Sequence, residues 1–177
     1  MVKSEILSAD ILLVQLESPV ETIKDAIKKA HEKGATVILN PAPAQKLDND
    51  LLRNVDIITP NTVEAEMLTG IKVTNEESLK QIVNEFFEFG VKNVLITLGS
   101  KGYFSGLTNG MEYVPSFKVT SIDTTGAGDV FSGSLAAFLA EGIPLEKAAK
   151  LSNACLLYTS DAAEERSSED IGGSRII

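Results

Sequence analysis

The residues best suited to chemistry lie in one short run, Asp-Thr-Thr-Gly-Ala-Gly-Asp at positions 123–129. Gly126 and Gly128 stand directly before Val130–Leu139, an apolar stretch that predicts a buried helix. A glycine-rich turn into a helix leaves backbone amides without partners, and with the helix dipole these bind anions. Because Asp129 can accept a proton from an attacking hydroxyl, the pattern favours phosphoryl transfer. The alternative is an ordinary helix start in which the dipole stabilises Asp129.

Short apolar runs alternate with amphipathic segments over the first 154 residues, and these elements must position that run. The predicted strands are Ile11–Leu16, Thr36–Asn40, Val55–Thr59 and Val94–Leu98, and short β segments with a hairpin turn at Asn109-Gly110 fill Lys101–Val119. The predicted helices run from a Ser18 cap to Gly34 and over Asn61–Leu68, Asn75–Phe89, Val130–Leu139 and Pro144–Asn153. The order indicates an α/β fold, a mainly parallel doubly wound sheet flanked by helices, with ligands at the carboxyl ends of the strands.

Composition excludes several classes of function. The formal net charge of −9 argues against nucleic acid as a partner, because phosphate binding needs clustered Lys and Arg. The apolar run Ala9–Leu16 is far shorter than the roughly 20 residues that span a bilayer, so we expect no membrane contact and no signal peptide. The single cysteine, Cys155, fits a reducing compartment and predicts a cytoplasmic protein. A single histidine, His31, rules out a histidine-based metal cluster and is assigned no catalytic role.

The run at 123–129 resembles the signature of the PfkB-type carbohydrate kinases, also called the ribokinase family. Pro60–Glu66 resembles the family's Asn-x-x-Glu motif, and Thr97–Gly102 resembles its nucleotide-binding turn. Gln15–Glu17 and Asn40–Ala44 are more similar to ribose-specific members than to fructokinases or adenosine kinases. The resemblance covers residues 1–154. It implies a ribokinase-like fold and ATP-dependent phosphorylation of the primary 5-hydroxyl of D-ribose, with sugar and ATP as the small-molecule partners.

Transferred position by position, the resemblance implies a role for each matching residue. Asp129 is the base that deprotonates the sugar hydroxyl, and Glu17 contacts another hydroxyl of the sugar. Glu64 orients hydrated magnesium, while Asp123 and Thr125 belong to a potassium site. The anion hole is formed by backbone amides of Asp129 and of Gly126, Ala127 and Gly128. The nucleotide contacts are Asn61, Thr97, Leu98, Gly99, Ser100, Lys101, Gly102, Gly128 and Asn153.

Several of these residues also have a purely structural interpretation. Glu17 follows a buried strand and suits a solvated loop. Asn61 and Glu64 have the spacing of a capping box, which is compatible with a role in binding. The stretch Thr97–Gly102 also suits the entry to a hairpin, with Lys101 as an exposed turn lysine.

The resemblance further indicates that this sequence is an internal fragment, truncated at both ends. The family's first strands and its β lid, which commonly forms a homodimer contact, have no counterpart here. From Cys155 the string CLLYTSDAA resembles a translated sequencing adapter, and a native polar tail is the alternative. We therefore expect residues 1–154 to be the C-terminal-side part of a kinase domain and residues 155–177 to be non-native. We also expect the chain alone to have little or no activity.

Two alternatives for the activity stay open from the sequence. The kinase can act on another substrate, such as fructose, deoxyribose or a nucleoside like adenosine, because the sugar-binding segment is not recognisable here. A non-catalytic nucleotide- or sugar-binding module on the same fold is the second alternative. The presence of Asp129 argues against it, since a pure binder needs no base.

Overall fold

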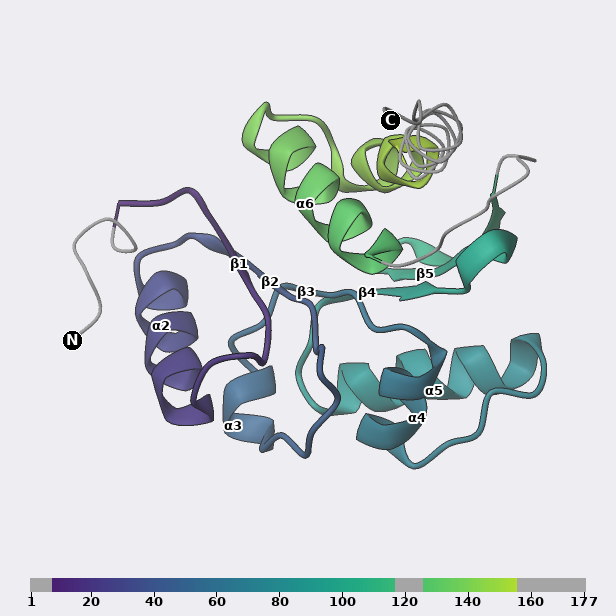
Figure 1. Cartoon of the computed structure of the whole chain (residues 1–177), viewed down its shortest axis with the longest axis horizontal. Helices are drawn as coiled ribbons and strands as arrows, with labels where there is room; N and C mark the ends of the chain where they lie inside the picture. Colours follow the sequence, from purple (N-terminus) through teal and green to yellow (C-terminus); the bar gives the residue numbers. More distant parts are fainter. Residues whose placement is uncertain (1–7, 117–125, 156–177) are drawn as a thin grey trace, which may run out of the picture.

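One mixed sheet organises the computed structural model, which describes residues 8–116 and 126–155 (Figure 1). Its six strands within these ranges lie in sequence order: β1 (Ile11–Val14), β2 (Thr36–Leu39), β3 (Ile57–Ile58), β4 (Asn93–Thr97), β5 (Gly102–Leu107) and β6 (Gly110–Pro115). Neighbouring strands from β1 to β4 pair in parallel, and β5 and β6 complete the sheet antiparallel. The predicted α/β class and mainly parallel sheet are therefore confirmed.

Helices cover both faces of this sheet, as a doubly wound fold requires (Figure 1). One face is covered by α2 (Val20–Glu32), α3 (Asn49–Leu52), α4 (Thr62–Thr69) and α5 (Glu76–Glu88). The other face is covered by α6 (Ala127–Ala140) and a helical stretch over residues 145–155. Successive strand residues point to opposite faces, so Val37 and Leu39 join one apolar core while Ile38 joins the other. Burial on both faces explains why these strands read as continuous apolar runs.

Several element boundaries differ from the sequence-based expectation. Pro19, not Ser18, occupies the cap position of α2, and no side chain caps that helix. The short helix α3 was not expected; Asp48 caps it by accepting a hydrogen bond from the Leu51 amide at 2.8 Å. The sequence also placed the start of the last predicted buried helix at Val130, three residues later than the observed start of α6 at Ala127. Capping geometry, which decides such boundaries, depends on the backbone path before each helix.

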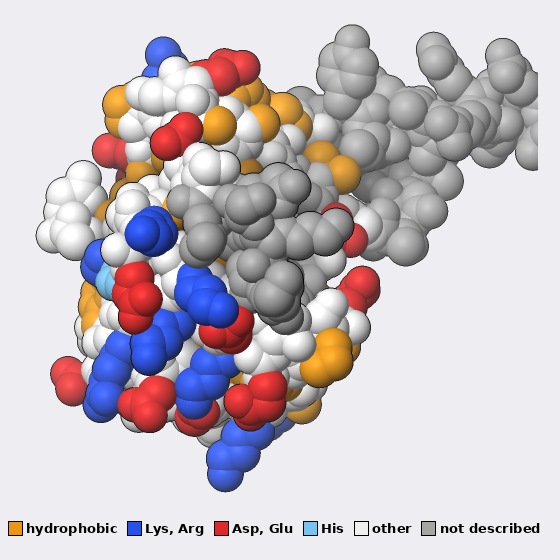
Figure 2. Space-filling view, turned by 90° about the vertical axis from the view of Figure 1, so that its left-hand side faces the viewer, with side chains coloured by type: hydrophobic (Ala, Val, Ile, Leu, Met, Phe, Trp, Pro, Cys, Tyr) orange, Lys and Arg blue, Asp and Glu red, His pale blue; other side chains and the backbone are white. Residues whose placement is uncertain are grey.

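The outer surface at the α2 end of the molecule mixes acidic side chains with lysines (Figure 2). Lys24 pairs with Asp48 and Lys29 pairs with Asp25, each at 2.6 Å, so both cations have local partners. Such exposed pairs contribute little to stability. Among the residues described, no helix is both long and apolar enough to cross a membrane.

Candidate functional site

Polar side chains follow three neighbouring parallel strands, and all of them reach α6. Gln15 comes directly after β1 and donates from Nε2 to Asp129 Oδ1 at 2.6 Å. Asn40 comes directly after β2 and donates from Nδ2 to the same oxygen at 3.2 Å. Thr59 comes directly after β3, and its hydroxyl lies 2.9 Å from that of Ser132 in a buried hydrogen bond. The carboxyl edge of the sheet thus positions the first turns of α6, as expected for a ligand site in this class of fold.

The N-terminus of α6 has backbone amides available for an anion. Gly126 occupies the cap position in the left-handed region (φ 77°), and no side chain of the described part of the chain caps the helix. Val130 N donates to Gly126 O at 3.0 Å, so the amides of Ala127, Gly128 and Asp129 have no partner within the helix. A Cβ atom at Gly128 would meet nothing within 4 Å. Packing therefore does not require this glycine, whereas close approach of a ligand to its backbone would.

Asp129 lines a cavity of about 220 Å³ together with Gln15 and Asn40. Glu17 lies outside it, in an adjoining cavity of about 320 Å³. The two cavities share Val14 and Gln15 as lining residues. Apart from these two residues, the Glu17 cavity is lined by the loop before α2 and the start of α2, so the structure does not bring Glu17 into the cavity that Asp129 lines.

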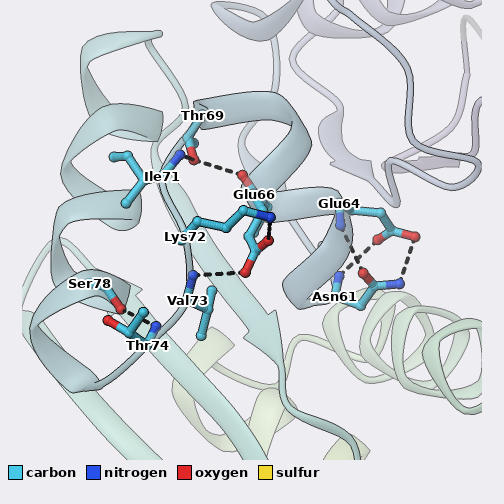
Figure 3. Close-up of polar contacts among 10 residues, drawn as sticks. Asn61, Glu64, Glu66, Thr69, Ile71, Lys72, Val73, Thr74 and Ser78 are labelled. Carbon is cyan, nitrogen blue, oxygen red and sulfur yellow. Dashed lines mark hydrogen bonds and ion pairs between the residues drawn. The ribbon is translucent and has the colours of Figure 1, made fainter.

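Asn61 and Glu64 form a complete capping box at the start of α4 (Figure 3). Asn61 Oδ1 accepts from the Glu64 amide at 2.9 Å, and Glu64 Oε2 accepts from the Asn61 amide at 2.8 Å. Asn61 Nδ2 also donates to Glu64 Oε1 at 2.9 Å. The structural interpretation of this pair is therefore confirmed, and Glu64 is a buried residue, only 8% exposed.

The Glu64 carboxylate lies in an unusual electrostatic environment. Burial raises the pKa of this carboxyl, the hydrogen bond from the Asn61 amide partly offsets the rise, and the negative charge of Asp129 adds to it. A cation beside Glu64 would relieve both the desolvation and the repulsion. Within residues 8–116 and 126–155, however, no group of three or more Asp, Glu, His or Cys side chains could hold a metal ion alone. Magnesium, which is held by one or two carboxylates plus water and substrate phosphates, is compatible with this arrangement.

The predicted nucleotide residues at the end of β4 lie next to Asn61. Thr97 and Asn61 form an isolated parallel bridge, in which Thr97 N donates to Pro60 O at 2.8 Å. The following residues Gly99–Lys101 make a single 3₁₀ turn. A cavity of about 630 Å³ is lined by Asn61, Thr97, Leu98, Gly99 and Lys101. Ser100 and Gly102 do not line it. At Gly102 a Cβ atom would lie 2.1 Å from Val114 O, so the β5–β6 hairpin itself requires that glycine.

Part of the lining of this cavity comes from the loop after α4. Hydrogen bonds to Glu66 hold that loop in place (Figure 3). Glu66 Oε1 accepts from the Val73 amide at 2.8 Å, and Oε2 accepts from Lys72 Nζ at 2.9 Å. The hydrogen bond from Lys72 lowers the pKa of the Glu66 carboxyl. The sequence showed Glu66 within the family motif but did not reveal this role, because its partners depend on the path of the loop after α4.

Asn153 lies in the helical stretch over residues 145–155, next to the end of β6. Its Nδ2 donates to Pro115 O at 3.0 Å, and the side chain is 1% exposed. Its Oδ1 is buried and has no hydrogen-bond partner among the residues that the structure describes. Because buried polar atoms in proteins are nearly always paired, this oxygen is suited to accept from a ligand donor. The two predicted potassium ligands, Asp123 and Thr125, lie outside the described residues.

The contacts of Gln15, Asn40, Thr59 and Ser132 were not predicted. Gln15 and Asn40 entered the sequence analysis only as parts of strings that resemble the family. Each of the three strand-end residues closes an apolar run with a polar side chain, and that is the signal that identifies them. Which helix they reach is decided by the packing of α6 against the carboxyl ends of β1, β2 and β3.

The family model described as "pfkB family carbohydrate kinase" matches residues 2–156. The ribokinase of Staphylococcus aureus is 48% identical over 132 residues, which are 75% of this chain and 43% of that protein. The ribokinase of Haemophilus influenzae is 41% identical over 152 residues, 86% of this chain and 50% of that protein. The chain therefore spans about half the length of the curated relatives that it matches.

Solved structures agree with this match. The structure of Arabidopsis thaliana ribokinase complexed with ribose and ATP superposes with a TM-score of 0.84 at 30% identity, covering 89% of this chain and 52% of that one. The residues that the family model matches include the strand-end residues, the start of α6 and Asp129. From sequence and structure together, the chain belongs to the pfkB family of carbohydrate kinases.

Proposed function

We propose that this chain belongs to an ATP-dependent kinase that phosphorylates the primary 5-hydroxyl of D-ribose. The observation that carries the proposal is the pairing of Asp129 with the uncapped amides of α6 beside one cavity. A base for an alcohol and donors for an anion are the two groups that phosphoryl transfer to a sugar requires. Membership of the family and the ribokinase relatives support ribose as the acceptor.

In this proposal Asp129 accepts the proton of the sugar hydroxyl while the hydroxyl oxygen attacks the γ-phosphorus of ATP. The bond between that phosphorus and the β–γ bridging oxygen breaks, and ADP leaves with the electron pair. The amides of Ala127, Gly128 and Asp129 stabilise the negative charge on the transferred group. Glu17 holds another hydroxyl of the sugar from the adjoining cavity.

ATP is held in this proposal by the residues that border the end of β4, Asn61 and the segment Thr97–Gly102. Asn153 supplies its unpartnered Oδ1 to a donor of the nucleotide. Glu64 orients hydrated magnesium, which neutralises charge on the nucleotide phosphates. Asp123 and Thr125 belong to a potassium site in the same proposal.

The test is a phosphoryl-transfer assay on two proteins. One is this chain alone, and the other is a completed kinase in which the chain replaces the matching segment of the S. aureus ribokinase. With ATP, magnesium and potassium, we expect the completed kinase to convert ribose to a 5-phosphate, followed by ³¹P NMR, and the chain alone to have little activity. Fructose, deoxyribose and adenosine are the competing acceptors, and faster turnover of one of them would replace ribose.

Replacement of Asp129 tests the base. Asp129→Ala should lower kcat by roughly a thousandfold or more, since it removes the general base and the charge that orients the hydroxyl. The Kd for ATP should stay within about threefold, because no described contact to the nucleotide residues is lost. Retained turnover would refute the assignment of Asp129. Binding of ATP and sugar without transfer in the unsubstituted protein would instead indicate a non-catalytic binding module.

The proposal also covers the cellular compartment and the oligomeric state of the complete kinase. A reducing compartment such as the cytoplasm suits a chain whose one cysteine is Cys155. For the complete kinase we propose a homodimer formed through a lid outside this chain. Sedimentation of the complete protein tests this, and a monomer at micromolar concentration would refute it.

A further inference from the structure

Two neutral amides hold one oxygen of Asp129, and the other oxygen is left for the substrate. We propose that Gln15 and Asn40 are positioning residues that fix Oδ1 of Asp129, so that Oδ2 is the oxygen that takes the proton of the sugar hydroxyl. The inference rests on the proposed function, in which Asp129 is the base. It adds two residues and an assignment of the individual oxygen atoms, neither of which follows from the family motif.

The geometry favours this division of the carboxylate. Both donors approach Oδ1, from Gln15 at 2.6 Å and from Asn40 at 3.2 Å, and they come from the ends of two different strands. Two donors on one oxygen restrict rotation of the carboxylate about its Cβ–Cγ bond. Within the described part of the chain, Oδ2 has no hydrogen-bond or ion-pair partner. Because Asp129 lines the cavity, we infer that Oδ2 is the oxygen available to a substrate there.

The sheet makes these donors rigid. Asn40 is only 4% exposed, and its backbone amide donates to Val14 O at 2.9 Å, so its side chain leaves a fixed point at the sheet edge. Helix α6 is held on the same edge by the buried hydrogen bond between Thr59 and Ser132. Base and donors therefore belong to one packed unit, which is the condition for orienting a base before substrate arrives.

Neutral hydrogen-bond donors also suit a general base better than a cationic side chain in the same place would. An ion pair with Lys or Arg would stabilise the carboxylate strongly and make it a weaker proton acceptor. Within the described ranges, no Lys, Arg or His lies within ion-pair distance of Asp129. Its negative charge acts on Glu64, where it helps to raise the pKa of the Glu64 carboxyl. Gln15 and Asn40 thus orient the carboxylate without placing a positive charge beside it.

The first test uses the chain as it is and needs no activity. Carboxyl ¹³C NMR follows the titration of Asp129 in the unsubstituted chain, in Gln15→Met and in Asn40→Leu, which keep the side-chain size but remove the donor. Loss of a hydrogen bond to a carboxylate should raise the midpoint by about one pH unit in each variant. Gln45→Met is the matched control, because it removes an amide that donates at 3.1 Å to Leu16 O on the same edge of the sheet and not to Asp129.

The second test uses the completed kinase. Gln15→Met and Asn40→Leu should lower kcat roughly tenfold each, shift the acidic limb of the pH–rate profile upwards and leave the KM for ATP unchanged. Gln45→Met should change none of these. If Asn40→Leu does not fold, the inference is tested by Gln15→Met alone. Gln15 is only partly buried, so we expect this variant to fold.

Two outcomes overturn the inference without touching the proposed function. In the first outcome, Gln15→Met has the same Asp129 titration midpoint and the same kcat as the control Gln45→Met, while Asp129→Ala still abolishes turnover. The other is a rise in the KM for ribose with unchanged kcat, which would make the amides sugar contacts. If instead the unsubstituted completed kinase phosphorylates no acceptor, the proposed function fails, and the NMR titration still decides whether the amides hold Asp129.

Discussion

Asn61 caps α4 and at the same time satisfies the buried carboxylate of Glu64, so its replacement by alanine has two separable costs. The first is loss of the cap on the Glu64 amide, which is typically about 1 kcal/mol. The second is loss of the donor to Glu64 Oε1, which leaves one carboxylate oxygen of this buried residue unsatisfied. Unsatisfied buried groups cost roughly 1–3 kcal/mol, so we expect Asn61→Ala to lower the free energy of unfolding by about 2–4 kcal/mol.

The chain contains a matched control for this prediction at the start of α5. Asn75 also forms a complete capping box, with its Oδ1 accepting from the Ser78 amide at 2.9 Å. Its partner is a neutral serine and not a buried carboxylate. Asn75→Ala should therefore lose only the cap, about 1 kcal/mol. Urea denaturation of both variants at pH 7 measures the difference, which is the contribution of the Glu64 carboxylate.

The pH dependence checks that the carboxylate is the cause. The pKa of Glu64 is raised in the folded protein, so ionisation of Glu64 destabilises the fold as pH rises. Removal of the Asn61 donor raises that pKa further and enlarges the loss at high pH. The excess cost of Asn61→Ala over Asn75→Ala should therefore shrink as pH falls from 7 toward the ordinary carboxyl range and Glu64 becomes protonated. Equal costs at pH 7, or an excess that does not change with pH, would refute the reasoning.

Two further predictions concern packing around the site. Ser132→Ala leaves the buried hydroxyl of Thr59 without its 2.9 Å partner and should lower the free energy of unfolding by about 1–3 kcal/mol. In a double-mutant cycle, the variant that carries both Ser132→Ala and Thr59→Val should lose less stability than the sum of the two single variants. Gly106→Ala would place a Cβ atom 2.3 Å from Val83 Cγ1 and should destabilise by roughly 1–3 kcal/mol, partly restored by Val83→Ala. Gly133→Ala, in open space on α6, should instead stabilise by about 0.5–1 kcal/mol, and thermal unfolding distinguishes the two signs.

The order and type of the elements follow from the sequence because they depend on local patterns. Apolar runs flanked by helical periodicity predicted β1, β2, β3 and β4, and the predicted helices between them were confirmed. The exceptions are local as well. The short α3, the start of α6 and the missing side-chain cap at Pro19 depend on the backbone path at each terminus, which hydrophobic periodicity does not report.

Two local features were also predicted from the sequence, of which the capping box is confirmed and the anion site stays a prediction. A glycine-rich turn before a helix predicted an anion site with Asp129 at its edge, and the motif from Pro60 to Glu66 predicted the capping box. Both rest on residues within one turn of each other, so their relation is nearly independent of the rest of the fold.

Only the tertiary structure decided which residues meet Asp129. Gln15 and Asn40 are 114 and 89 positions away from it, and no local pattern relates them. The parallel crossovers bring the ends of β1 and β2 to one edge of the sheet, and packing of α6 over that edge selects which polar side chains reach the carboxylate. Side-chain hydrogen bonds depend on distances of a fraction of an ångström, and those distances exist only once both faces of the sheet are packed.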